Sequence, residues 1–215
     1  MGVTRFPDQR KSRPDAPELV HQFLITLSHV DPLVWRRIQV PQSYTFWDLH
    51  VAIQDAMGWE DRHLHEFRLF DDQNRKVISI GLPTDMMSPE HPVLPGWTIP
   101  LARYFEAREW LGLPILYAYD FGDGWEHALT HEGMQTAKRS VKYPRCVSGA
   151  RRCPPEDCGG PHGYGELLKV IARPKHPQHR SVIEWVGGAF DPASFDPKRV
   201  AFDNPKERWT KAFRQ

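Results

Sequence analysis

The stretch TFWDLHVAIQDAMG, residues 45–58, decides the fold class of this chain of 215 residues. Its apolar side chains recur at spacings of three and four, which is the pattern of an amphipathic helix with one buried face. Thr45 with Asp48 three residues later resembles a capping box, with Asp in place of the usual Glu. Gly58 has the position of a left-handed C-terminal cap. The sequence therefore predicts a helix between these two caps.

Apolar runs of strand length lie on both sides of this helix. Residues 23–27 and 34–41 precede it, with Pro32 between them, and they are close enough to pair as an antiparallel hairpin. Residues 63–70 follow it, and they alternate between two faces as a strand does. The order strand, strand, helix, strand predicts an α+β fold with a mostly antiparallel sheet.

The rest of the chain continues this pattern after a region rich in prolines. Residues 71–98 are predicted to be mostly loop, and residues 115–119 and 125–129 form a second hairpin around a glycine turn. A Cys/Gly/Pro-rich loop follows, and helical segments are expected at 164–171, 182–186 and 205–213. We expect the core between the first helix and the sheet to contain Trp35, Leu49, Ile53, Met57, Phe67 and Tyr119.

Length and composition suit one domain with extensions, or at most two small domains. Residues 1–18 are polar and are predicted to form a flexible tail, and residues 19–200 a single α+β domain. That domain contains a Pro-rich insertion at about 81–114, and residues 201–215 form a C-terminal helical extension. A cytoplasmic protein is expected, because the N-terminus lacks the apolar core of a secretory signal.

The charge balance restricts the classes of partner. Lys and Arg number 28 against 27 Asp and Glu, so the net charge is only +1. Dedicated nucleic-acid binders usually carry a basic excess, so specific nucleic-acid binding is not expected. No apolar run reaches the length of about 18 residues that a membrane span needs. A protein or a small molecule is the expected partner.

All three cysteines lie close together, with the spacing Cys-x6-Cys-x4-Cys over Cys146, Cys153 and Cys158. Thiolates and imidazoles are good zinc ligands, so the three cysteines with His127 or His162 could form a structural zinc site. The spacing is wider than the Cys-x2-Cys of zinc fingers. Two alternatives remain: buried free thiols that pack as small apolar groups, and reactive thiols with redox or catalytic chemistry.

Four carboxylates lie near this cysteine region. Asp120 and Asp123 flank a glycine turn, and Glu156 and Asp157 follow in the later loop. Carboxylates gathered at one point can bind a hard cation or act as acid and base. The alternative is turn chemistry, because an Asp side chain often accepts hydrogen bonds from nearby backbone N–H groups.

Two histidines share one face of the strand predicted over 63–70. They could chelate a metal ion, or they could be half-buried, hydrogen-bonded histidines. With the carboxylates they define a candidate pocket of Asp120, Asp123, Trp125, Glu156, Asp157, His63 and His65.

Arg36 and Arg37 follow Trp35 in the second strand and must point to opposite faces of the sheet. Contact with nucleic acid is one interpretation, and solvated arginines on the sheet faces are the other. The chain has no Gly-x-Ser-x-Gly elbow, Walker loop or dinucleotide-binding fingerprint, so no familiar enzyme class is indicated.

Several of these motifs together resemble the plasmid Ri ORF-three-like family, also labelled insertion-element passenger TnpR proteins. The matching blocks cover roughly residues 20–200 in the family's order. They are Pro32–Pro41, Asp48–His50, Ala56–Trp59, His63–Phe67, Tyr119–His127, Tyr143–Cys146, Cys153–Gly160, Gly163–Tyr164, Glu184–Gly188 and Phe190–Pro192.

The resemblance implies an α+β domain with a β-grasp-like opening and a helical C-terminal part. The TnpR label suggests a role in transposition, although the chain shows no recombinase chemistry. Family members generally carry another residue at the position of His162, and this favours His127 as the fourth zinc ligand.

Three functions are consistent with these features. The first is a non-enzymatic binding or interaction protein, associated with plasmids or mobile elements, that carries a structural zinc. The second is a metal-assisted hydrolytic enzyme that uses the Asp120–His127 hairpin and the Pro154–Gly160 loop. The third is a DNA-binding accessory protein of transposition.

Overall fold

The predicted first helix forms as α1 (Phe46–Met57), with both predicted caps in place. The Asp48 carboxylate accepts a hydrogen bond of 2.8 Å from the Thr45 backbone N–H, and the Thr45 hydroxyl accepts one from the Asp48 N–H. Gly58 adopts φ 90° and its N–H donates to Gln54 O at 2.8 Å. Both halves of the capping box are therefore present. A computed structural model describes residues 18–83, 92–106 and 112–213.

One sheet organises the described residues and confirms the α+β class. Its strand order is β5-β4-β3-β6-β7-β1-β2-β8, and all its neighbours are antiparallel except the parallel pair β4 and β5. The strands are β1 (Leu19–Leu27), β2 (Trp35–Pro41), β3 (His65–Phe70), β4 (Lys76–Gly81), β5 (Val93–Pro95), β6 (Ile115–Tyr119), β7 (Trp125–Thr136) and β8 (Arg145–Ala150).

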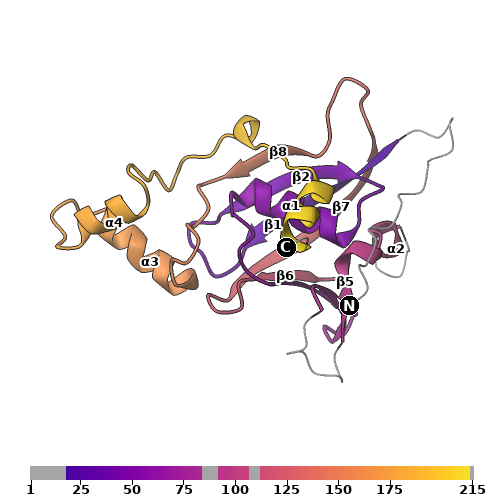
Figure 1. Cartoon of the computed structure of the whole chain (residues 1–215), viewed down its shortest axis with the longest axis horizontal. Coiled ribbons are helices and arrows are strands. Elements are labelled where there is room, and N and C mark those ends of the chain that lie inside the picture. The colour runs from indigo at the N-terminus through magenta and orange to yellow at the C-terminus, as the bar shows by residue number, and fades with distance from the viewer. Residues whose placement is uncertain (1–17, 84–91, 107–111, 214–215) are drawn as a thin grey trace.

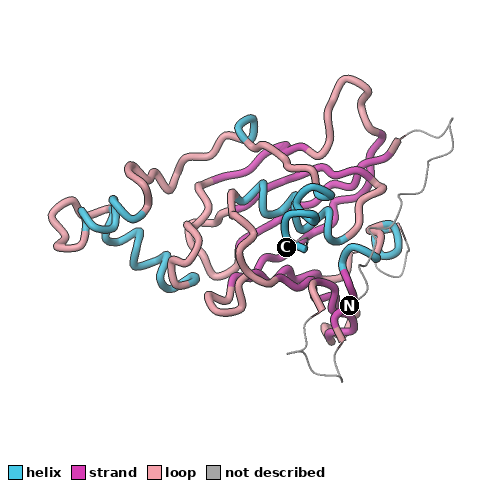
Figure 2. The backbone as a smooth tube through the Cα atoms, viewed as in Figure 1, coloured by secondary structure: helices cyan, strands magenta, loops and turns pink. Residues whose placement is uncertain are grey.

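The remaining helices follow β5, and three of the four lie after β8. They are α2 (Ala102–Phe105), α3 (Gly160–Ile171), α4 (His179–Trp185) and α5 (Pro205–Phe213), with 3-10 turns η1 (Gly96–Thr98) and η3 (Pro197–Arg199). Figures 1 and 2 show α3 and α4 together at one end of the molecule, whereas α1 and α5 lie over the sheet.

Both predicted hairpins and the predicted order of the opening are confirmed. β1 pairs with β2, and β6 with β7, in antiparallel register. The β6–β7 hairpin lies between β3 and β1 in the sheet, so the third strand of the opening does not contact the first two. The predicted N-terminal tail falls outside the described residues, except for Glu18.

Three strands form where the sequence predicts loops, namely β4, β5 and β8. β4 lies in the region 71–98, where the prolines dominate the pattern, and it pairs with β3. β8 carries Cys146 and pairs with β2, which lies more than 100 residues earlier. The sequence of β8 is weak in strand-forming residues, so its extended form depends on this distant partner.

Helix α1 is covered on all sides, since eleven of its twelve residues are buried. The sheet covers one side, and the C-terminal segment covers the other. The Trp47 indole N–H donates to Pro205 O at 3.0 Å, and the ring meets Trp209 edge-on at 5.1 Å between centroids. Arg208 forms an ion pair of 2.6 Å with Asp55 of the helix.

Five of the six predicted core residues belong to the buried apolar cluster, namely Leu49, Ile53, Met57, Phe67 and Tyr119. Trp35 does not belong to it and is partly exposed. The pleat of β2 turns Val34 and Arg36 inward instead, and each is at most 1% exposed.

Burial of Arg36 corrects the prediction that both strand arginines are solvated. The Arg36 guanidinium donates to three carbonyl oxygens, Ala56 O at 2.8 Å, Trp35 O at 2.8 Å and Ala150 O at 2.9 Å. Arg37 lies on the other face and forms a two-pronged ion pair with Glu132 at 2.7 and 2.8 Å. Ala56 lies in the last turn of α1, so Arg36 supplies positive charge at the negative end of the helix dipole.

Truncation of the buried helix face tests this packing. Leu49→Ala or Ile53→Ala should lower the free energy of unfolding by about 2–5 kcal/mol, because both side chains are fully buried and leave a cavity. Leu33→Ala is the matched control, since Leu33 is half exposed and its truncation should change stability by less than about 0.5 kcal/mol. Urea denaturation measures all three, and unchanged midpoints for the helix variants would contradict the described core.

Candidate functional site

One histidine and three carboxylates converge where the β6–β7 turn meets the loop after β8. His63 Nε2 lies 2.9 Å from Asp157 Oδ1, 3.5 Å from Asp120 Oδ2 and 3.8 Å from Glu156 Oε2. We call these four residues the His63 site. One ligand atom each from His63, Asp120 and Asp157 lies within 4.8 Å of the other two, a separation that a single metal ion can bridge.

Two of the carboxylates are held by one oxygen and present the other to His63. Asp120 Oδ1 accepts hydrogen bonds from the backbone N–H groups of Gly122 and Asp123 at 3.0 and 3.2 Å. Glu156 Oε1 accepts from the Glu60 N–H at 2.8 Å and from the Tyr119 hydroxyl at 2.9 Å. The second oxygen of Asp120 and that of Glu156 are therefore held toward His63 before any ligand binds.

These hydrogen bonds confirm the predicted turn chemistry of Asp120 and add a further role. Asp120 adopts φ 52° at the start of the turn, a conformation that Asp tolerates better than most residues. Asp123 has a structural role, since its Oδ2 accepts a 3.0 Å hydrogen bond from the Gly159 N–H and joins the hairpin to the later loop. Asp120 thus closes the turn and reaches the His63 site, while Asp123 joins the β6–β7 hairpin to the later loop.

The site is negative and reachable from solvent. Among the described residues, no lysine or arginine forms an ion pair with Asp120, Glu156 or Asp157. The side chains of His63 and Asp157 are 29% and 56% exposed, whereas those of Asp120 and Glu156 are only 10% and 11% exposed. The hydrogen bond to Glu156 and burial together raise the pKa of Tyr119 above its usual range. Such a site attracts cations.

The structure does not assemble the predicted cysteine shell. Among the described residues, two groups of three His, Cys, Asp or Glu residues have ligand atoms within 4.8 Å of one another. Neither of these groups contains a cysteine. Cys146 lies on β8 with its thiol 3.6 Å from Ser148 O, Cys153 is buried in the apolar core, and Cys158 is partly buried. Cys153 is close enough to Cys158 for an electrostatic interaction, and the buried Arg36 interacts with Cys146 and Cys153. The thiols are neighbours of one another without forming one ligand shell.

Protein hydrogen bonds hold the cysteine loop. The Trp59 indole N–H donates to Pro154 O at 2.9 Å, and the Tyr164 hydroxyl donates to Arg152 O at 3.4 Å. Pairing of β8 with β2 fixes the start of this region.

The two histidines predicted as the fourth cysteine-site ligand differ in burial, and neither belongs to a described group of three ligand atoms within 4.8 Å of one another. His127 is fully buried, and its Nδ1 lies 3.1 Å from Tyr117 O, while Nε2 has no hydrogen-bond partner. Its ring meets Trp59 edge-on at 5.1 Å. His162 is exposed on α3. Trp125 of the candidate pocket is a core residue, only 1% exposed.

His65 belongs to a second group, which the sequence did not reveal. Its ring stacks on His50 at 3.4 Å, and His50 Nε2 lies 2.8 Å from Asp61 Oδ1. His50 Nδ1 lies 2.8 Å from the Tyr117 hydroxyl, so both of its ring nitrogens have partners. His63 and His65 therefore do not form the predicted pair, because β3 begins at His65 and His63 lies before the strand. The sequence signal for this group was His50, a histidine within the predicted first helix.

Comparisons with known proteins agree with this fold. The family described as Plasmid pRiA4b ORF-3-like protein matches residues 19–199. The chain belongs to this family. Its relatives include the uncharacterized protein y4hQ of Sinorhizobium fredii (strain NBRC 101917 / NGR234), 34% identical over 194 residues, which cover 89% of this chain and 94% of that protein. The crystal structure of a protein of unknown function, MM3350 from Methanosarcina mazei Go1, superposes with a TM-score of 0.75 and 39% identity, covering 87% of this chain and all of that one.

These pRiA4b ORF-3-like relatives support the fold and the family, and their descriptions name no ligand or reaction. In the part of the chain that the structure describes, no helix is long and apolar enough to cross a membrane. The functional argument therefore depends on the side chains of the site.

Burial of His127 should make the protein less stable in mild acid. Burial lowers the pKa of His127 from 6.5 to about 4, so below pH 6.5 the unfolded chain binds a proton that the folded chain refuses. Stability should fall as the pH drops from about 6.5 to about 4. Between pH 7 and pH 5 the loss from this one group is about 2 kcal/mol.

Urea denaturation at pH 7 and at pH 5 measures this loss. The same pair of measurements on His127→Gln should show a pH dependence smaller by about that amount. Equal pH dependence in the two proteins would contradict a neutral buried His127. His21, whose pKa burial also lowers to about 4, contributes equally to both proteins and does not disturb the comparison.

The thiols should react slowly in the folded protein. Burial raises the pKa of Cys146 to about 11 and that of Cys158 to about 12, and that of Cys153 lies higher still. Only the thiolate is the nucleophile, so alkylation by iodoacetamide at pH 8 should be roughly 100-fold slower than for a free thiol. Peptide mapping by mass spectrometry follows each cysteine, and urea-unfolded protein is the control. Rapid labelling of native Cys146 or Cys158 would favour the reactive-thiol hypothesis instead.

Proposed function

We propose that this protein is a binding module that holds one divalent metal ion in the His63 site. The observation that carries the proposal is the orientation of two carboxylates. Asp120 and Glu156 each use one oxygen to accept hydrogen bonds and direct the other oxygen toward His63. Three carboxylates without a lysine or arginine partner repel one another, and a cation would relieve this repulsion.

The donor set suggests the kind of ion. One imidazole nitrogen with carboxylate oxygens suits zinc or manganese better than calcium, which prefers oxygen ligands alone. The cysteines remain a second hypothesis for zinc, with His127 or His162 as the fourth ligand. That hypothesis has weaker support, because among the described residues no group of three ligand atoms within 4.8 Å of one another contains a cysteine.

Two aspects of the proposal derive from the family and from charge. The family is named after a plasmid reading frame, which supports an association with plasmids or mobile elements. The +1 net charge and the negative His63 site support a protein or small-molecule partner and weigh against specific DNA binding, including a role as a DNA-binding accessory protein of transposition.

Metal-assisted hydrolysis is the second candidate function. The observation that favours it is the exposure of His63 and Asp157, because a bound ion would keep positions open to water and substrate. Hydrolysis of p-nitrophenyl acetate and p-nitrophenyl phosphate, with and without added zinc or manganese, measures this activity. A metal-dependent rate that Asp157→Asn abolishes would establish the enzyme, and its absence would leave the binding module.

Calorimetric titration of the metal-free protein tests the metal site. Zinc or manganese should bind with a stoichiometry of one ion per chain, and Asp157→Asn should weaken binding by at least about tenfold, since even outer-shell partners of a metal contribute 10–100-fold. Asp157 adopts φ 56°, which Asn also tolerates, so the variant should fold normally.

Two control variants separate the hypotheses. Glu166→Gln removes an exposed carboxylate of α3 and should leave metal affinity unchanged. Cys146→Ser with Cys158→Ser should likewise retain binding. Loss of the ion in this cysteine variant, with full binding in Asp157→Asn, would assign the metal to the cysteines and overturn the His63 site.

A further inference from the structure

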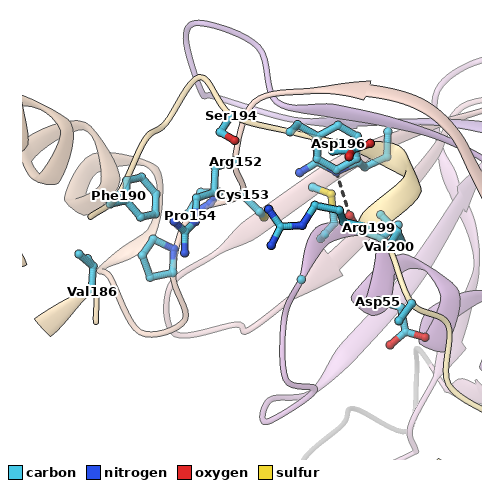
Figure 3. A pocket seen from close by; sticks show the side chains of 17 residues that line it. Asp55, Arg152, Cys153, Pro154, Val186, Phe190, Ser194, Asp196, Arg199 and Val200 are labelled. Atoms are coloured by element: carbon cyan, nitrogen blue, oxygen red, sulfur yellow. Dashed lines mark hydrogen bonds between the residues drawn. The ribbon is translucent and has the colours of Figure 1, made fainter. Parts of the chain in front are cut away.

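A second pocket lies on the other side of the Cys153–Cys158 loop from the His63 site, beneath the segment that follows α4. It has a volume of about 510 Å³ and is bounded by the end of α1, residues 152–155 and parts of residues 186–201. Figure 3 shows Arg152 and Phe190 toward one side of it and Arg199 and Asp55 toward the other. We call it the arginine pocket, because Arg36, Arg152 and Arg199 all line it.

Arg36 brings a buried positive charge to this pocket without a carboxylate partner. Its side chain is 1% exposed, and its hydrogen bonds go only to backbone carbonyl oxygens. The guanidinium carbon lies 3.7 Å from the centre of the Phe195 ring, which fixes the plane of the group. A buried charge usually needs an opposite charge, and neutral carbonyls replace it only in part.

The two other arginines also lack an acidic partner among the described residues. No ion pair joins Arg152 or Arg199 to a carboxylate there, and the Arg152 guanidinium lies 4.5 Å above the centre of the Phe190 ring. Three guanidiniums without such partners at one pocket make a positive surface that repels itself.

The acidic residues of the pocket are already engaged and do not balance this charge. Asp55 forms the 2.6 Å ion pair with Arg208 and also accepts a hydrogen bond from the Asp203 N–H at 2.9 Å. Asp196 accepts a 2.9 Å hydrogen bond from the Lys198 N–H as the cap of η3. Asp196 keeps its negative charge in this hydrogen bond, but three arginines outnumber it, so the pocket has a net positive charge.

We propose that the arginine pocket binds a small organic oxyanion, a phosphate or a carboxylate group carried by a small molecule. Guanidiniums recognise both groups with paired N–H donors, and Arg36 and Arg152 are already oriented by aromatic rings. The volume is within the range of small-molecule sites. The ligand supplies the negative charge that the protein itself does not provide.

Calorimetric titration of the metal-free protein with inorganic phosphate and, separately, with succinate tests the proposal. At least one of the two anions should bind with a stoichiometry of one per chain and raise the melting temperature. Arg152→Gln combined with Arg199→Gln should weaken that binding by about tenfold or more. Both side chains are exposed, so the variant should fold, and circular dichroism checks this.

Arg173→Gln is the matched control, because it removes an exposed arginine outside the pocket and should leave the affinity unchanged. Asp157→Asn should also retain anion binding, which keeps this result independent of the His63 site. Tighter binding of phosphate would assign a phosphate ester, and tighter binding of succinate a carboxylate. Absence of binding by both anions at about 10 mM, or equal binding by the double variant, would overturn the proposal.

Discussion

The complete burial of helix α1 is the constraint on which the other features depend. A short helix of twelve residues is marginal in water, so its stability must come from packing on several sides. The sheet supplies one side, with the Tyr117 hydroxyl 2.8 Å from His50 Nδ1 and 2.9 Å from Gln54 Nε2. The C-terminal segment supplies the other side through Trp47 and Asp55. This position fixes both ends of the helix, and the C-terminal end then positions parts of both candidate sites.

The C-terminal end of α1 leads directly into the two charged regions of the molecule. Arg36 donates to Ala56 O in the last helical turn, and Gly58 and Ala56 line the arginine pocket. Two residues later the Glu60 N–H holds Glu156 of the His63 site. The loop from Cys153 to Cys158 runs between the regions, with Pro154 and Pro155 at the positive pocket and Glu156 and Asp157 at the negative site. One rigid loop thus separates a surface suited to cations from a surface suited to anions.

The cysteines show that residues of one type that are close in the sequence can lie on different parts of the fold. Three thiols within a Gly/Pro-rich stretch have the right chemistry for zinc, yet one belongs to a strand, one to the apolar core and one to the loop. Burial raises the pKa of all three thiols above the usual value of a cysteine. In the described structure His63 and two carboxylates, which the sequence suggested only as part of a candidate pocket, have ligand atoms within 4.8 Å of one another.

The sequence by itself determined the elements whose signals are local. The caps of α1, the two hairpins and the α+β class follow from spacings within a few residues, and so does the turn chemistry of Asp120. Tertiary structure decided everything that depends on partners far along the chain. It made a strand of Arg145–Ala150 by pairing it with β2, buried Arg36 against the end of α1, and separated His63 from His65. The physical reason is that burial, hydrogen bonding and charge act through space, and the sequence shows only which residues are neighbours along the chain.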